Sequence, residues 1–270
     1  MILSKESAQQ GDLVQLVGQS HKNFIIQLQE GQRLQTHRGI LAHDDLIGKQ
    51  WGSQVYSHLG APFYILQPAL GDLITTTRRT TQILYPKDIG FILMNMGIGP
   101  GLHVIEAGTG SGAMTTAIAH AVGTHGHVTT YEIREEMMNL ARKNITRLGM
   151  DDRVTFKHRD ISDGFDEQNI IALFMDIPKP ESCISQVKQA LVSGGFFGCI
   201  VPTTNQVIRL LPVLRHEGFA FIEVCELMLR YYKPVTQRFR PTDRMVAHTG
   251  FLVFARSIVP SDDIEKFEKK

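Results

Sequence analysis

Apolar positions follow two different rhythms along this chain of 270 residues. From about residue 11 to residue 68, short apolar segments alternate with Gly, Asn and charged residues, which is typical of short strands joined by turns. From about Tyr85 onward, apolar stretches of strand length alternate with amphipathic stretches of helix length, the pattern of βαβ units around a parallel sheet. The sequence therefore predicts a small β-rich domain over 1–75, a doubly wound α/β domain over 76–258, and a charged tail, 259–270, that we expect to be disordered.

The second region predicts a regular succession of strands and helices. Gly149 follows one amphipathic stretch, at the place where a left-handed residue commonly ends a helix. Two later apolar segments, 220–229 and 250–255, have strand character and are predicted to close the sheet in antiparallel orientation. The other predicted strands are 102–106, 127–132, 154–157, 170–176 and 196–201, and the predicted helices are 113–122, 135–148, 181–191 and 205–216.

A glycine-rich segment, 106–112, reads Glu-Ala-Gly-Thr-Gly-Ser-Gly and lies between a predicted strand and a predicted helix. Glycines at such a turn let the backbone fold tightly and let a ligand approach the main-chain N–H groups. Glu132 ends the next strand, where such folds place a carboxylate that accepts the ribose hydroxyls. Together these residues predict a nucleoside site.

The spacing narrows the choice of nucleoside. The glycines follow the order Gly-x-Gly-x-Gly, whereas a pyrophosphate on a helix N-terminus goes with Gly-x-Gly-x-x-Gly. Glu106 would repel a diphosphate but suits an ammonium or a sulfonium group. Asp160 is a candidate acceptor for an adenine amino group, and Met137 is a candidate to pack on the ring. The alternative is a plain tight turn with solvated acids at the strand ends.

Asp176 ends a strand in the sequence Asp-Ile-Pro-Lys-Pro, at the sheet edge where ligands bind in doubly wound folds. Pro178 and Pro180 remove backbone donors and stiffen the loop. The loop lacks the aromatic residue of the Asn/Asp-Pro-Pro-aromatic motif found in enzymes that methylate exocyclic amino groups. Attack by a ring nitrogen such as N1 of adenine fits better, because a carboxylate can stabilise the cationic product or accept a proton from its amino group. The alternative is that Asp176 caps a helix or a turn.

Residues 230–244 combine five cations with three aromatic residues, a composition suited to phosphate contacts and base stacking. The alternative is a solvated charged face with a few packed tyrosines. The formal net charge of +1 excludes neither nucleic acid nor small molecules as partners. The three cysteines form no CxxC pair and no zinc-site spacing, so we expect no metal and a reducing, cytoplasmic environment.

Several of these segments together resemble the tRNA (adenine-N1)-methyltransferases of the TrmI type, over about residues 11–258. The matching segments are 81–88 (Thr-Gln-Ile-Leu-Tyr-Pro-Lys-Asp), 106–112, 131–134 (Tyr-Glu-Ile-Arg), 176–180, Asn205-Gln206, Arg240-Pro-Thr and His248-Thr-Gly. The resemblance implies a Rossmann-like class I methyltransferase domain that uses S-adenosylmethionine. It also implies methylation at N1 of adenine 58, and sometimes 57, in the T-loop of tRNA, by a homotetramer.

The resemblance and the patterns above supply the candidate site residues. Asp176 matches the catalytic carboxylate, and Tyr85 matches an aromatic residue near the target base. Many members have an acidic or amide residue where Lys179 stands, so the role of that position stays open. The candidate cofactor residues are Glu106, Gly108, Thr109, Gly110, Ser111, Gly112, Ala113, Glu132, Met137, Asp160 and Asp176, and the candidate tRNA residues are Arg79, Tyr85, Asn205, Gln206, Arg238, Arg240, Arg244 and His248.

Two other functions are open at this point. A methyltransferase of the same fold acting on another substrate would keep Glu132 but would not need the cations of residues 230–244. A non-catalytic tRNA-binding partner subunit would not need an intact glycine loop or Asp176, and the sequence has both.

Overall fold

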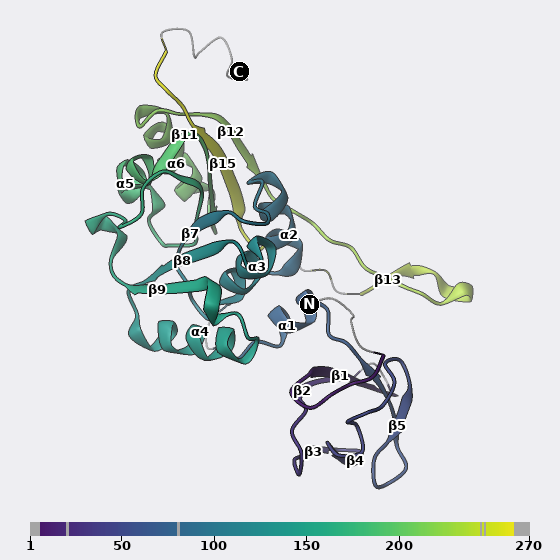
Figure 1. Cartoon of the computed structure of the whole chain (residues 1–270). Helices are drawn as coiled ribbons and strands as arrows, with labels where there is room; N and C mark the ends of the chain where they lie inside the picture. The colour runs from purple at the N-terminus through teal and green to yellow at the C-terminus, as the bar shows by residue number, and fades with distance from the viewer. Residues whose placement is uncertain (1–5, 20–21, 80–81, 244, 246, 262–270) are drawn as a thin grey trace. The chain divides into compact units, whose positions relative to one another are not determined.

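A computed structural model describes residues 6–19, 22–79, 82–243, 245 and 247–261 (Figure 1). The segment predicted to be disordered falls largely on 262–270, outside the described residues, and so does the candidate tRNA residue Arg244. The chain divides into two compact units, Met1–Thr76 and Thr77–Lys270. No helix of the described residues is long and apolar enough to cross a membrane.

The first unit is rich in β-structure, as predicted, and its strands pair antiparallel. Its main sheet has the order β2-β1-β6-β5, and a separate pair, β3 and β4, forms a hairpin. Alternate side chains of the strands point into one core, in which Leu16, Phe63 and Ile65 are at most 1% exposed. The bounds are β1 Leu13–Gly18, β2 Asn23–Gln27, β3 Arg33–Thr36, β4 Gly39–Ala42, β5 Gln54–Tyr56 and β6 Pro62–Leu66, followed by helix α1, Leu70–Thr75.

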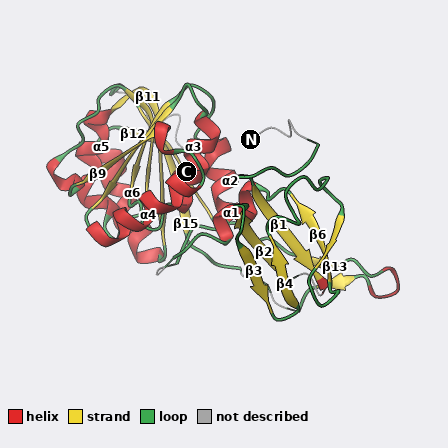
Figure 2. Cartoon of the chain, turned by 60° about the horizontal axis from the view of Figure 1, so that its bottom comes forward, coloured by secondary structure: helices red, strands yellow, loops and turns green. Residues whose placement is uncertain are grey.

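The second unit is a doubly wound α/β domain, which confirms the predicted fold class. Its seven-stranded sheet has the order β12-β15-β11-β10-β7-β8-β9, and helices cover both faces (Figure 2). The strands are β7 His103–Ala107, β8 His127–Glu132, β9 Val154–His158, β10 Ile170–Met175, β11 Leu191–Val201, β12 Phe219–Cys225 and β15 Phe251–Ser257. The helices are α2 Pro86–Asn95, α3 Ala113–Val122, α4 Glu135–Arg147, α5 Ile184–Ala190 and α6 Thr204–His216, with short 3-10 turns η2 Asp151–Arg153, η3 Ile161–Asp163 and η4 Pro180–Cys183.

Three predicted details of the α/β unit are wrong. The helix expected over 181–191 is divided into η4 and α5, and β11 begins at Leu191, five residues earlier than predicted. Of the two late strands, only β15 runs antiparallel to the rest. It pairs antiparallel with both β11 and β12, so β12 at the edge runs in the same direction as β11.

The order of the strands places two chain segments side by side. After β7 the chain crosses to β8 and β9 on one side, and β10 then pairs with β7 on the other. The carboxyl ends of β7 and β10 are therefore neighbours at the point where the strand order reverses, the usual ligand site of such sheets. The glycine loop follows β7 and Asp176 follows β10, so the topology brings them together.

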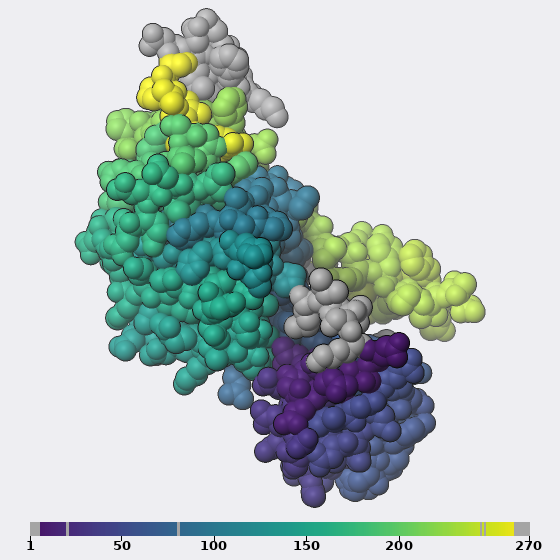
Figure 3. Space-filling model, in the orientation of Figure 1, coloured from purple at the N-terminus to yellow at the C-terminus, as the bar shows by residue number. Residues whose placement is uncertain are grey.

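Between β12 and β15 the chain leaves the sheet as an arm, which comprises the described residues of 226–250. Its tip is a hairpin of β13, Tyr232–Lys233, and β14, Arg240–Pro241, joined by the 3-10 turn η5, Thr236–Arg238. The arm extends outward from the α/β unit (Figures 1 and 3). Lys87 holds the two ends of the arm together. Its ammonium group donates to the Leu227 carbonyl and to the Thr249 hydroxyl, both at 2.9 Å, and pairs with the fully buried Asp88 at 2.8 Å.

Candidate active site

The glycine loop adopts the backbone geometry that its sequence predicts. Gly108, Gly110 and Gly112 have φ values of 93°, 53° and 86°, in the left-handed region that favours glycine. A Cβ at Gly108 would lie 2.1 Å from the carbonyl oxygen of Asp176, so only glycine lets the two loops meet this closely. The Asp176 N–H donates to the Ala107 carbonyl at 2.8 Å and fixes the approach from the other side.

These two loops form the floor of a pocket. It is lined by Glu106, Asp176, the loop residues Gly108 to Ser111, Ala113 and three residues that precede α2, namely Gln82, Ile83 and Leu84, together with Met114. The structure thus brings most of the candidate cofactor residues together. Of the others, Gly112 is the N-cap residue of α3, while Glu132, Met137 and Asp160 do not line this pocket.

The carboxyl group of Glu106 is buried at 1% exposure under the glycine loop. Its Oε2 accepts hydrogen bonds from the hydroxyls of Thr115, at 2.5 Å, and Thr130, at 2.7 Å, and Thr130 also bonds to Thr109 at 2.6 Å. Burial raises the pKa of Glu106 to about 8, against the effect of the two hydroxyls. This carboxyl group is therefore largely protonated at neutral pH, and a cationic ligand beside it would favour its ionised form.

Replacing Glu106 by glutamine is expected to make protein stability less dependent on pH. Because the folded-state pKa lies above the ordinary value of 4.5, the wild type loses stability as the pH rises from about 4.5 through about 8. Glutamine keeps an acceptor for Thr115 and Thr130 and carries no titratable proton. Thermal melts across this range should give a Tm for Glu106→Gln that exceeds wild type by several degrees above pH 8 and by little near pH 5. Parallel Tm curves for the two proteins would contradict this prediction.

Glu132 is 4% exposed, and its carboxylate holds the glycine loop in place. Its Oε2 accepts the Gly110 N–H at 2.9 Å, and its Oε1 accepts the Arg134 N–H at 3.0 Å. The Arg134 guanidinium also contacts this carboxylate, at 3.1 Å. A ribose bound here would have to displace that side chain, which is 50% exposed and has room to move aside. The role of Glu132 as a ribose acceptor stays a prediction.

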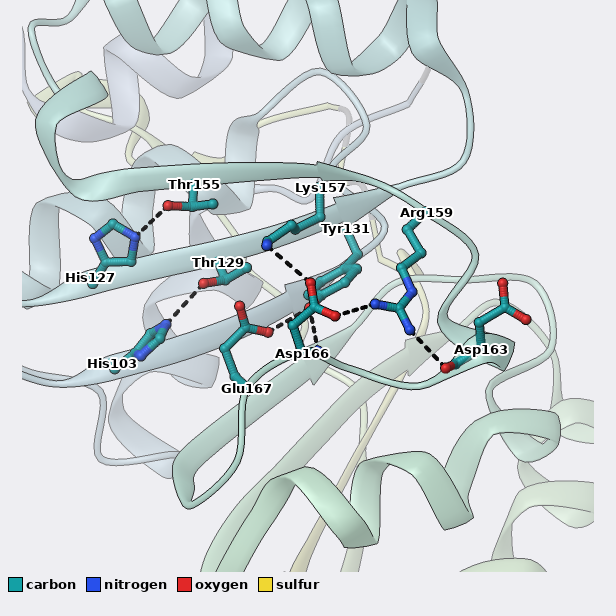
Figure 4. A network of polar contacts seen from close by, with 10 residues as sticks. All are labelled: His103, His127, Thr129, Tyr131, Thr155, Lys157, Arg159, Asp163, Asp166 and Glu167. Carbon is teal, nitrogen blue, oxygen red and sulfur yellow. Dashed lines mark hydrogen bonds and ion pairs between the residues drawn. The ribbon is translucent and has the colours of Figure 1, made fainter.

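Asp160 lies at the start of η3, where its Oδ1 accepts the Ser162 N–H at 2.9 Å, and this hydrogen bond lowers its pKa. A polar network fixes the loop that carries it (Figure 4). Arg159 pairs with Asp166 and donates to the Asp163 carbonyl at 2.8 Å. The Asp166 N–H donates to the Tyr131 hydroxyl at 3.0 Å, and Tyr131 directly precedes Glu132. The network therefore links the positions of the two candidate acids, whose contacts with a ligand stay predictions.

Asp176 faces the pocket from the end of β10. Asp176 is exposed to solvent, and the protein atoms around it remove part of the hydration of its carboxylate. This desolvation, with the nearby charge of Glu132 and against that of Arg134, raises the pKa of Asp176 to about 6. The residue at the N-cap of η4 is Lys179 and not Asp176, so the capping alternative is not what this structure shows. A carboxylate with this pKa suits proton acceptance near neutral pH.

Tyr85 stands immediately before α2 as its N-cap residue, and Pro86 occupies the first helical position. Its hydroxyl accepts a hydrogen bond from the Gln82 side chain at 3.0 Å. Gln82 lines the pocket, so Tyr85 contacts a pocket residue without lining the pocket itself. Its proximity to a target base stays a prediction.

The candidate tRNA residues of the arm lie in an exposed cluster. Tyr232 and Phe239 stack with ring centroids 5.2 Å apart, and Phe239 is 70% exposed. Asp243 pairs with both Lys233, at 2.6 Å, and Arg240, at 2.8 Å, an arrangement that no sequence pattern predicts. Arg238 ends η5 at the tip, and Arg79 is exposed ahead of the pocket segment.

Three further candidates lie near the start of α6. His248 contacts Glu226 at 2.8 Å and the Pro202 carbonyl at 3.1 Å, and these two acceptors raise its pKa. Asn205 is exposed in the first turn of the helix. Gln206 contacts the loop of Asp176, because its side chain donates to the Pro178 carbonyl at 3.0 Å. The side chain of Lys179 is exposed in that loop.

Four pocket residues were not among the candidates: Gln82, Ile83, Leu84 and Met114. The first three lie inside the segment 81–88 that carried the resemblance, so its position before Pro86 was a usable signal. Met114 follows Ala113 at the start of α3 and is 4% exposed. Nothing in its apolar helical context distinguishes it from a core residue.

The pocket has features that fit S-adenosylmethionine. Ser111 is 3% exposed, lines the pocket, and its hydroxyl has no hydrogen-bond partner among the described residues. A buried hydroxyl of this kind needs a hydrogen-bond partner, and a polar ligand in the pocket would supply one. A Cβ added at Gly110 would have no atom within 4 Å, so the backbone of this residue is open to a ligand. Glu106 contributes a carboxyl group to the same pocket. The fold and this site define an S-adenosylmethionine-dependent methyltransferase.

The chain belongs to the family described as tRNA methyltransferase complex GCD14 subunit, whose profile matches residues 62–244, and a TrmI-like N-terminal profile matches residues 8–55. A Methanocaldococcus jannaschii protein named tRNA (adenine(57)-N(1)/adenine(58)-N(1))-methyltransferase TrmI is 32% identical, over 94% of this chain and 98% of that one. The crystal structure of tRNA (m1A58) methyltransferase TrmI from Aquifex aeolicus is 34% identical, with a TM-score of 0.82 over 94% of this chain and 100% of that one. The crystal structure of a SAM-dependent O-methyltransferase from Thermotoga maritima is 42% identical, with a TM-score of 0.90 over 97% and 99%. The resemblance found in the sequence is thereby confirmed.

Proposed function

We propose that this methyltransferase transfers a methyl group from S-adenosylmethionine to N1 of adenine 58 in the T-loop of tRNA, with adenine 57 as an additional target. The observation that carries the proposal is the juxtaposition of Asp176 with the glycine loop, where a Cβ at Gly108 would strike the Asp176 backbone. The names of the Methanocaldococcus jannaschii and Aquifex aeolicus relatives support the choice of substrate.

Glu106, the loop from Gly108 to Ala113 and Asp176 would hold the cofactor, with Glu132 behind Gly110 and with Met137 and Asp160 as further candidate contacts. When bound, S-adenosylmethionine supplies an electrophilic methyl group. N1 of adenine carries a lone pair, so it can act as the nucleophile without prior loss of a proton. The base becomes cationic on methylation, and the Asp176 carboxylate stabilises that charge or accepts the proton of the amino group. Tyr85 would lie along the target base.

The target adenine lies inside the folded tRNA, so the enzyme must expose it and offset a few kcal/mol of lost stacking. The arm offers stacked aromatic rings and cations for contacts with splayed bases and phosphates. We propose a homotetramer in the cytoplasm, in which several subunits contact one tRNA. Light scattering of the purified protein, alone and with tRNA, tests the assembly, and a monomer under both conditions would exclude it.

The direct test is methyl transfer to unmodified tRNA with labelled cofactor, followed by nuclease digestion and mass spectrometry of the nucleosides. The proposal expects 1-methyladenosine, located in the T-loop by fragment analysis. A second candidate, transfer to an oxygen atom, is favoured by the name O-methyltransferase that the similar Thermotoga maritima protein carries. It predicts an O-methylated product, and recovery of that product without 1-methyladenosine would overturn the proposal.

Arg240→Ala is expected to weaken tRNA binding by roughly tenfold, about 1.4 kcal/mol for one charge-assisted contact. The slope of log affinity against log salt should fall by about 1, because one phosphate contact is lost. Binding of the product S-adenosylhomocysteine should not change. Asp243→Asn is the matched control, since it releases Arg240 and Lys233 from their carboxylate and should bind tRNA at least as tightly as wild type. An unchanged salt slope in Arg240→Ala would exclude a phosphate contact by Arg240.

A further inference from the structure

The loop that carries Asp176, residues 176–180, contains two prolines, which have no N–H to donate. Two of its carbonyl groups accept hydrogen bonds that hold its later part. The Lys179 carbonyl accepts hydrogen bonds from the Ser182 N–H, at 3.2 Å, and hydroxyl, at 2.8 Å, both from the same segment of chain. The Pro178 carbonyl accepts from the Gln206 side chain at 3.0 Å, and this bond comes from a different element, α6.

The two halves of the Gln206 amide have separate partners. Its Oε1 accepts hydrogen bonds from the Thr203 hydroxyl, at 2.7 Å, and the Thr203 N–H, at 3.2 Å, which completes the capping box of α6. Its Nε2 donates to Pro178. The amide oxygen therefore stabilises the start of helix α6, and the amide N–H group holds the loop that carries Asp176.

Helix α6 is a firm support for this contact. Val207, Leu210 and Leu214 are buried and pack into the core of the α/β unit. Arg209, one turn beyond Gln206, pairs with Glu181 at 2.9 Å, directly after the same loop. The helix thus grips the loop at two points that lie on the same side of the helix.

We infer that Gln206 is a positioning residue for methyl transfer, which holds the Asp176 carboxylate in place through the Pro178 carbonyl. This inference rests on the proposed function. The peptide bond between Ile177 and Pro178 is planar, and the φ angle of Pro178 is fixed by its ring. A restraint on the Pro178 carbonyl therefore limits the rotations available to the loop only two residues after Asp176. Gln206 acts through the loop rather than as a direct tRNA contact.

Three variants separate the two halves of the amide. Gln206→Glu keeps the acceptor oxygens of the capping box and loses the donor to Pro178. Thr203→Ala loses the cap hydroxyl and keeps the donor. Gln206→Met loses both halves without adding a charge. Each is assayed on the same tRNA for kcat, KM for tRNA, affinity for S-adenosylhomocysteine and Tm.

The expected result is a kcat about 100-fold lower in Gln206→Glu and Gln206→Met, the cost of a misplaced reacting group, with KM for tRNA within twofold of wild type. Thr203→Ala should lower Tm by a few degrees and keep kcat within a few-fold. Equal loss of kcat in Thr203→Ala and Gln206→Glu would show that only the helix start matters and would overturn the inference. So would a wild-type kcat in Gln206→Glu, or a defect confined to KM for tRNA. Wild type is assayed first, and its failure to form 1-methyladenosine would instead contradict the proposed function.

Discussion

Asp176→Asn is expected to lower kcat for methyl transfer by about 100-fold to 10,000-fold, the usual contribution of a positioned general base. Asparagine has the same shape but can neither carry a negative charge nor accept the amino proton. The backbone contacts of this position, the N–H to Ala107 and the carbonyl against Gly108, do not depend on the side chain and should persist. The pocket should therefore keep its shape, and the affinity for S-adenosylhomocysteine, measured by calorimetry, should fall much less than kcat even though Asp176 lines the pocket.

The pH dependence of the wild type supplies a second readout for this carboxylate. Because the ionised form of Asp176 is required and its pKa lies near 6, kcat/KM should fall as the pH decreases through about 6. The residual activity of Asp176→Asn should lack this acidic limb. Retention of the limb in the variant would assign the titration to another group, and a kcat near that of wild type would exclude Asp176 as the base.

Gly108→Ala is expected to destabilise the protein by about 3 kcal/mol or more and to abolish cofactor binding. Two costs combine: an L side chain in the left-handed region costs about 1–2 kcal/mol, and overpacking costs about 1–3 kcal/mol. The new Cβ would lie 2.1 Å from the Asp176 carbonyl oxygen, which is backbone and cannot turn aside. For a unit of this size we expect Tm to fall by roughly 6–12 °C.

Gly110→Ala is the matched control for that experiment. Its φ is also positive, at 53°, but no atom lies within 4 Å of the added Cβ. It should incur only the conformational cost, about 1–2 kcal/mol, with a correspondingly smaller fall in Tm. Equal destabilisation by the two substitutions would mean that the close approach of the two loops contributes nothing beyond backbone conformation.

The elements most predictable from the sequence were those in which the hydrophobic pattern and the flanking turn residues indicate the same bounds. The predicted bounds of α3, between Gly112 and Gly123, and of β8 coincide with the structure. Helix α2 was not predicted, because Pro86 and Gly90 obscure its helical character. The early start of β11 was hidden by Gly194 and Gly195, which in sequence resemble a turn.

The candidate site divides in a similar way. The glycine loop and Asp176 were identifiable because strand ends in a parallel sheet converge on one edge. The hydroxyls around Glu106 come from Thr115 and Thr130, and only the folded chain brings these ordinary helix and strand residues to one carboxyl group. The same holds for the bond from Gln206 to Pro178, which spans 28 residues of sequence. Local sequence carries no record of such partners.

The contacts of Lys87 at the two ends of the arm affect which changes of arm length and sequence the protein can tolerate. Lys87 bonds to Leu227 and Thr249, so the two ends of the arm are held at the same place on the α/β unit. The conformational entropy lost in closing the loop between these two residues depends only weakly on the length of the loop. Insertions, deletions or grafted recognition sequences within it should therefore be tolerated by the catalytic scaffold, which makes the arm a natural place for specificity to diverge.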